Sequence, residues 1–179
     1  MCDVPSIKSE VDRMFKLPGV KPGSDLEALF IAVGFIVVQW GQAEQSLDLL
    51  VSALSHAYPG KRAKKLPVML EVKLDFVRKC IANTPEIAHL SKDLESLLQE
   101  FESLAPTRHD LVHGAITSIT PTSRGFTFIK FDSDKVHNST REVLLSGSDF
   151  PLLRRRLLRL AGEATRMARA VMDSRPGVK

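Results

Sequence analysis

Along much of this chain, apolar residues recur every three or four positions with polar residues between them, which is the spacing of an amphipathic helix. The first such segment covers residues 25–57, where apolar side chains recur every three or four positions. Ser24 or Asp25 is suited to cap its start. At 1.5 Å per residue this helix would be roughly 50 Å long, so we expect a bend near Gly34 or Gly41.

The most apolar part of this segment, residues 28–38, is eleven residues long. A helix that spans a bilayer needs about 20 apolar residues. The run therefore predicts a buried helix of a globular domain and no membrane anchor.

Three more segments show the helical spacing, at about 66–81, 87–101 and 149–173. Ser148 or Asp149 is suited to cap the last one. Its buried stripe is predicted to consist of Leu153, Leu157, Leu160, Ala164, Met167 and Val171. Pro106 cannot donate a backbone hydrogen bond, so the chain should kink there or restart as a short helix that ends at Gly114.

Between about 115 and 147 the apolar spacing changes to two residues, with a turn at 123–125. The expected fold is mainly α, with a bundle of four to five helices and a small antiparallel β-hairpin or sheet inserted before the last helix. Residues 1–23 contain five Pro and Gly residues and predict a flexible leader. Residues 24–179 then form one helical domain.

The 179 residues contain two cysteines, Cys2 and Cys80, which provide neither a disulfide framework nor a paired-cysteine metal motif. The N-terminal region has no apolar core of a secretory signal. We therefore expect a cytoplasmic protein with no membrane partner.

Positive charge gathers at the C-terminal end. Residues 149–179 carry eight basic and three acidic groups, whereas residues 1–60 carry four basic and seven acidic ones. Such a surplus is compatible with RNA binding through Arg155, Arg156 and Arg159. A solvated face of the last helix explains the same arginines, and composition alone favours that explanation.

The segment with the clearest chemistry is Arg108-His109-Asp110-Leu111-Val112-His113-Gly114. Arg108 offers a permanently charged fork that fits phosphate oxygens, and His113 can take and return protons near neutral pH. Five positions along an ideal helix turn by about 140°, so the two residues do not share a face by spacing alone. A short helix or a symmetric dimer would relax this restriction.

This segment resembles the defining motif of the HEPN superfamily, which is an Arg, a polar residue, three further residues and a His, often followed by Gly. Arg108 and His113 match the functional pair, and His109 stands at the polar position, where the family more often has Asn. Trp40 and Glu44 on the long first helix and the apolar helices that follow fit the same order of elements.

The resemblance implies a metal-independent endoribonuclease that acts as a homodimer, with Arg108 and His113 of both subunits in one cleft. It needs no cofactor, and it cleaves RNA through attack of the ribose 2′-hydroxyl. Relatives of this kind serve as toxins or in phage defence, often with a neutralising antitoxin partner. The family also contains non-catalytic dimeric modules that bind nucleic acids, nucleotides or proteins, which is the alternative function.

Three residues are assigned supporting roles. His109 and Asp110 lie within the motif, and Glu44 lies on a seam that otherwise faces the core, where it would pair with Arg108 or His109. An exposed Glu44 at the edge of the stripe is an equal alternative.

The segment also allows a structural role and a metal-binding role. Arg108 and His113 could pair with Asp110, Glu102 or carbonyl groups at a helix end. His109 and His113 have the four-residue spacing of zinc ligands, with Asp110 nearby, but the sequence offers no obvious third ligand, so no metal is expected. Surface positions are expected for His56, His89 and His137.

Overall fold

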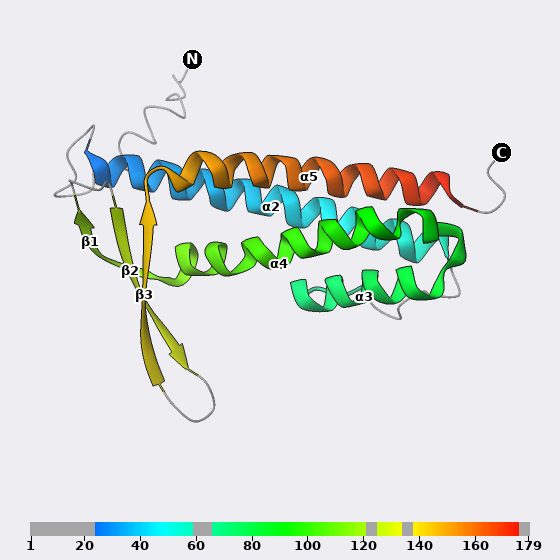
Figure 1. Cartoon of the computed structure of the whole chain (residues 1–179), viewed down its shortest axis with the longest axis horizontal. Coiled ribbons are helices and arrows are strands. Elements are labelled where there is room, and N and C mark those ends of the chain that lie inside the picture. The colour runs from blue at the N-terminus through cyan, green and yellow to red at the C-terminus, as the bar shows by residue number, and fades with distance from the viewer. Residues whose placement is uncertain (1–23, 59–65, 121–124, 134–137, 176–179) are drawn as a thin grey trace, which may run out of the picture.

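The structure, a computed structural model, describes residues 24–58, 66–120, 125–133 and 138–175. The predicted leader and most of the turn at 123–125 lie outside these ranges. The helices are α2 (Asp25–Ala57), α3 (Leu70–Asn83), the 3₁₀ helix η2 (Pro85–Leu90), α4 (Ser91–His113) and α5 (Asp149–Asp173). The strands are β1 (Ala115–Thr120), β2 (Gly125–Ser133) and β3 (Asn138–Ser146), so the mainly α fold with a small antiparallel sheet before the last helix is confirmed (Figure 1).

Helices α2 and α5 lie side by side and run in the same direction (Figure 1). Thr165 on α5 donates a hydrogen bond to the Ser46 hydroxyl on α2 at 3.2 Å, and the Tyr58 hydroxyl donates to the carbonyl of Ser174 at 3.3 Å. These two contacts fix the register of the pair, which forms the centre of the bundle.

Helix α4 packs against α2 in the opposite direction, and Trp40 meets Phe101 edge to face with 6.1 Å between the ring centroids. Helix α3 covers the half of the bundle that lies away from the sheet (Figure 1). Its buried Lys73 pairs with Asp48 of α2 at 2.6 Å. The part of α2 nearer the sheet is therefore left without this cover.

Helix α2 begins as predicted, since the Ser24 side chain accepts a hydrogen bond from the amide of Glu27. It is one continuous helix through Gly34 and Gly41. By length and composition it could cross a membrane, because its most apolar 18 residues have a mean hydropathy of 1.6, but only 28% of that window is buried. The expectation of a buried helix is therefore wrong for its outer face, because no described element covers that face.

The predicted stripe of α5 is confirmed, and all six of its residues are buried. The expected restart as a short helix at Pro106 is wrong, because α4 continues through Pro106 to His113. Pro106 lies on the exposed side of the helix, where water can satisfy the carbonyl that loses its donor. Buried Phe101, Leu104 and Leu111 hold the helix on both sides of it.

Two helix starts differ from the predicted ones. Helix α3 begins at Leu70, three residues after Pro67. Leu66 precedes this proline and is therefore disfavoured in a helix, so the helix does not extend back to it. The segment that begins at Pro85 first forms η2, and α4 follows from Ser91.

The three strands form an antiparallel sheet in the order β1-β2-β3. Phe126 and Phe128 of β2 are buried, and Phe126 meets Phe150 at the start of α5 edge to face. The far ends of β2 and β3 project beyond the helices as an arm (Figure 1). The sheet thus closes the end of the bundle where α4 ends.

Candidate phosphate-binding and acid-base site at the end of helix α4

The predicted motif occupies the last two turns of α4. Gly114 follows the helix, and its amide donates to the carbonyl of Asp110 at 2.8 Å. A Cβ at Gly114 would lie 2.5 Å from that carbonyl oxygen and 3.1 Å from Cβ of Phe128. The glycine therefore allows α4 to turn directly into β1 against the buried face of β2.

Arg108 is half-buried, and its Nε atom is buried with no hydrogen-bond partner among the described residues. A guanidinium N–H without a partner in a buried position loses its hydration without compensation. This donor is therefore unused within the described part of the chain, and because Nε itself is closed to solvent, an anion that meets the exposed part of Arg108 would have to draw the side chain outward to use it.

His109 and His113 lie one turn apart and are both exposed. Their ring centroids are 4.6 Å apart, and the rings are tilted by 53°. Two imidazoles at this spacing can act on one substrate, since one can accept a proton while the other donates one.

The pKa of His109 is lowered below its ordinary value of 6.5, first by desolvation and then by the positive charges of Lys130 and His113, with Arg108 adding to the effect. The opposing effect of Asp110 is smaller than those of Lys130 and His113. His109 therefore favours its neutral form near pH 7, and the charges of Lys130 and His113 both act in that direction.

Asp110 is buried and accepts two hydrogen bonds from Arg141 of β3, at 2.7 and 3.2 Å. Lys130 of β2 lies 3.8 Å from the same carboxylate. Asp110 therefore fastens the β2–β3 arm to the end of α4. Neither Lys130 nor Arg141 was predicted from the sequence, and the one available signal was the alternation of Phe126, Phe128 and Lys130 along a strand with one face against the bundle.

The acidic groups proposed as partners for the motif are engaged elsewhere. Asp110 pairs with Arg141, and Glu102 accepts two hydrogen bonds from Arg78 at 2.8 and 2.9 Å. In the part of the chain that the structure describes, no group of three or more His, Cys, Asp or Glu residues is placed to hold a metal ion.

The structure does not bring Glu44 to the motif. Glu44 is half-buried and lines a surface groove with Asp48, Leu66 and Lys73. Because Trp40 packs on Phe101 and the helices are antiparallel, Glu44 and Arg108 lie about 16 Å apart along the bundle. The predicted pairing of Glu44 with Arg108 or His109 is therefore wrong.

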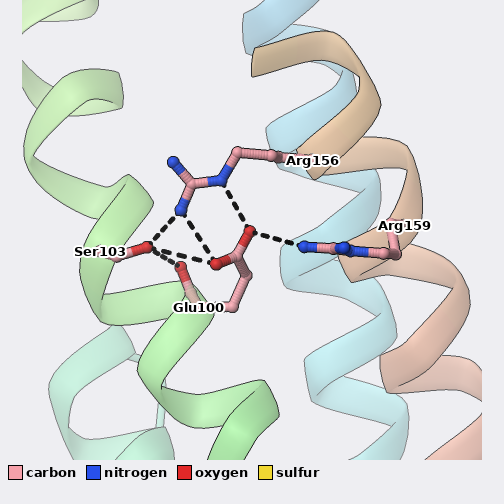
Figure 2. Close-up of polar contacts among 4 residues, drawn as sticks. All are labelled: Glu100, Ser103, Arg156 and Arg159. Atoms are coloured by element: carbon pink, nitrogen blue, oxygen red, sulfur yellow. Dashed lines mark hydrogen bonds and ion pairs between the residues drawn. The ribbon is translucent and has the colours of Figure 1, made fainter. Parts of the chain in front are cut away.

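The three arginines predicted to bind RNA differ in their surroundings. Arg156 donates to both carboxylate oxygens of Glu100, at 2.8 and 2.9 Å, and to the hydroxyl of Ser103 at 2.6 Å (Figure 2). Arg159 lies 3.5 Å from the same carboxylate. Arg155 is exposed and lies beside an apolar groove between α2 and α5. Arg155 and Arg159 are thus more open to an anionic ligand than Arg156.

The remaining histidines do not join the site. His56 is exposed, and its Nδ1 hydrogen-bonds to the Ser52 carbonyl at 2.8 Å. His89 is exposed and lies near Ser174, while His137 lies outside the described residues. Of the two cysteines, Cys80 is buried, and Cys2 is also outside these residues.

No family model, no curated protein and no solved structure matches this chain. The site is therefore interpreted from its own geometry and from the motif.

Proposed function

We propose that this protein is a metal-independent endoribonuclease of HEPN type. The observation that carries the proposal is the combination of a buried Arg108 N–H without a partner among the described residues and two exposed, adjacent imidazoles, His109 and His113. The phosphate of RNA is an anion that such a donor can bind, and the ribose beside it has a hydroxyl that an imidazole can deprotonate.

The reaction is a transesterification. An imidazole of the His109–His113 pair accepts the proton of the 2′-hydroxyl, and the 2′-oxygen forms a bond with the adjacent phosphorus. The bond from phosphorus to the 5′-oxygen breaks, and the second imidazole donates a proton to this leaving group. Arg108 stabilises the charge on the phosphorane. The products are a 2′,3′-cyclic phosphate and a 5′-hydroxyl end.

The electrostatics of the pair support this division of work. His109 is held in its neutral form by desolvation and by Lys130, so it is suited to accept the proton. We assign the donor role to His113, the residue that matches the functional histidine of the motif.

The wider setting of the proposal is based on the resemblance alone. It includes action in the cytoplasm as a homodimer, a role as a toxin or in phage defence, and a neutralising antitoxin partner. These parts of the proposal are independent of the chemistry assigned to Arg108 and His113 and need tests of their own.

The test is cleavage of end-labelled single-stranded RNA in the presence of EDTA. We expect the wild-type protein to cleave it and to leave 2′,3′-cyclic phosphate ends. His113→Ala and Arg108→Ala should each lower the rate by about 100-fold or more, because a positioned proton carrier or charge contributes that much. His56→Ala replaces an exposed histidine far along α2 and should leave the rate unchanged.

Two outcomes would contradict the proposal. If wild-type protein and His113→Ala leave RNA equally intact, the chain is not a ribonuclease, and retained RNA binding would then indicate the non-catalytic binding module. If cleavage disappears with EDTA and returns with a divalent cation, the reaction is not metal-independent.

A further inference from the structure

The outer face of α2 carries a continuous apolar surface. We call this surface the α2 outer face; it comprises Phe30, Ile31, Gly34, Val37, Val38 and Gly41, all of which are exposed. Ile31 and Val38 expose 68% and 60% of their surface, and Phe30 and Val37 expose 38% and 39%. These residues lie on consecutive turns, so they form one patch and not scattered single side chains.

This part of α2 also lacks the charges that normally keep a helix face in water. No charged residue occurs between Glu27 and Glu44, a stretch of sixteen residues. An exposed apolar surface of this kind usually marks an interface. The described elements leave it open because α3 covers only the opposite half of the bundle (Figure 1).

The face repeats after seven residues. Phe30, Ile31 and Gly34 are followed at the same spacing by Val37, Val38 and Gly41. A seven-residue repeat keeps one stripe of a helix turned toward a partner helix. A Cβ atom built at Gly34 or Gly41 would meet nothing within 4 Å. Each glycine therefore leaves a depression into which a side chain of a partner could fit.

We infer that a second copy of this chain docks on the α2 outer face, with the two α2 helices antiparallel about a two-fold axis. In the register that pairs residue 30 with residue 41, Phe30 of each copy lies over Gly41 of the second copy. The same register places Val37 over Gly34. Large residues thus meet glycines in both directions, which is the self-complementarity that a two-fold interface requires.

The size of the surface is sufficient for a dimer. The outer face continues into a groove of about 1000 Å³ between α2 and α5, which has Phe35, Pro151 and Leu158 in its apolar lining and the charged Asp25, Arg154 and Arg155 among its other lining residues. In that register residues 25–46 of the two α2 helices overlap over about 32 Å, and with the flanking groove the surface is about two helix diameters wide, on the order of 600 Å². A standard interface buries about 800 Å² on each partner.

A lipid bilayer suits this helix less well. The opposite face of α2 is buried in the bundle, and farther along the helix Asp48 forms an ion pair with Lys73. Inserting α2 into a membrane would require separating it from α5 and breaking that ion pair. A bilayer also gives no reason for glycines at a seven-residue repeat, whereas the close approach of another helix does.

The interface also borders the proposed active site. Because Trp40 is level with Phe101 in an antiparallel pair, Phe30 is level with the end of α4 near Val112, which is itself 38% exposed. A docked copy would stand beside the segment that holds Arg108 and His113. In this last respect the inference depends on the proposed function, whereas the interface itself does not.

The first test is the molar mass of the full chain in solution by sedimentation equilibrium. We expect twice the chain mass of 19.8 kDa for the wild type. The Gly34→Gln/Gly41→Gln variant should raise the dissociation constant at least about tenfold, because its side chains fill the depressions. These side chains point to open solvent in the single chain, so the helical circular dichroism should be retained. Ala82→Gln, at an exposed small residue of α3, is the matched control and should dimerise like the wild type.

The second test is the register, in a Cys2→Ser background. Phe30→Cys/Gly41→Cys should form a covalent dimer under mild oxidation. Phe30→Cys or Gly41→Cys alone should not, because residue 30 of one chain lies about 16 Å along the paired helices from residue 30 of the second chain, and the same holds for residue 41.

A monomeric wild-type protein, or a double glycine variant that dimerises as tightly as the wild type, would overturn the inference. Sedimentation of the wild type with vesicles in place of dimer formation would assign the face to lipid and would also overturn it. These measurements need no RNA, so a dimer without cleavage would contradict only the proposed function.

Discussion

At the end of α4, position 114 requires a glycine because neighbouring atoms leave no space for a side chain. Its backbone angles do not require one. Its φ of −80° is open to any residue, but the Asp110 carbonyl and Phe128 leave no room for a Cβ. The glycine that often follows the histidine of the motif thus has a packing role in this chain.

Gly114→Ala should destabilise the fold, because the backbone of α4 or β2 must shift to admit a methyl group. We expect a loss of about 1–3 kcal/mol in the free energy of unfolding, measured with urea. Gly162→Ala is the matched control, since a Cβ at Gly162, at an exposed position of α5, meets nothing within 4 Å. That change should instead add up to about 1 kcal/mol through helix propensity. Equal effects of both changes would contradict the packing role.

His109 should make the protein less stable in mild acid. Its folded-state pKa lies below the ordinary 6.5, so the unfolded chain binds the proton more readily. The stability should therefore fall as the pH drops through about 6.5 and should not depend on this group above that range. His109→Gln should show a smaller loss of stability between about pH 7.5 and 5.5 than the wild type.

The origin of this shift can be measured directly by titration of the His109 ring in NMR spectra. Lys130→Met should raise the pKa of His109 but leave it below 6.5, because desolvation is the larger cause. Lys92→Met, at the exposed start of α4, serves as the control. If the His109 titration is unchanged in the Lys130→Met variant, Lys130 does not influence the pKa of His109.

At the scale of elements, α4 and α5 are joined by ion pairs along their facing surfaces. Glu100 binds Arg156 and Arg159 (Figure 2). Two turns earlier, Asp93 binds Arg166 at 3.2 Å. The hydrogen bonds from Arg156 are the first cause that lowers the pKa of Glu100.

Glu100→Gln should weaken this contact by about 1 kcal/mol, a modest effect because the pair is partly exposed and screened by salt. The lowered pKa of Glu100 means that its contribution is present above about pH 4.5 and is lost as the pH falls through the folded-state pKa. Urea unfolding at neutral and acid pH measures both effects. Glu71→Gln, at an exposed position of α3, should change neither, and an equal change there would contradict the assignment to the ion pair.

The elements that the sequence predicted are those fixed by local chemistry. The stripe of α5, the Ser24 cap and the small antiparallel sheet follow from side-chain spacing and turn residues, and the structure confirms them. The continuity of α4 through Pro106 depends instead on which side of the helix meets solvent. Local spacing does not contain that information.

The site was predictable only in part, for the same reason. Arg108, His109 and His113 are close in sequence and were found as a motif. Lys130 and Arg141 reach the site only through the pairing of the β2–β3 arm with α4. Glu44 was misplaced because the relative register of α2 and α4 is set by tertiary packing, in which Trp40 contacts Phe101.

At the scale of the whole molecule, the surplus positive charge of the C-terminal helix is only partly available to a ligand. Arg156 is neutralised by Glu100, and Arg154 lies over the ring of Phe35 at 4.9 Å. Of the three arginines predicted to bind RNA, Arg155 is therefore the most available to a ligand, with Arg159 second.

Arg155→Gln should weaken RNA binding and reduce the salt dependence of the binding constant by the equivalent of one phosphate contact, about 0.7 in the logarithmic slope for single strands. Arg156→Gln should leave the slope nearly unchanged and lower the stability of the fold. Filter binding across a salt series, with urea unfolding of each variant, separates the two effects. An unchanged slope for Arg155→Gln would assign this arginine to solvent.

The parallel pairing of α2 and α5 has a consequence for how the chain is made. The contacts of Ser46 with Thr165 and of Tyr58 with Ser174 join residues 119 and 116 positions apart. Closing so long a loop is slow, and the ribosome delivers α5 after all the elements described before it. Until then α2, the most apolar of the described helices, lacks its main partner, and its apolar side chains are exposed on the nascent chain.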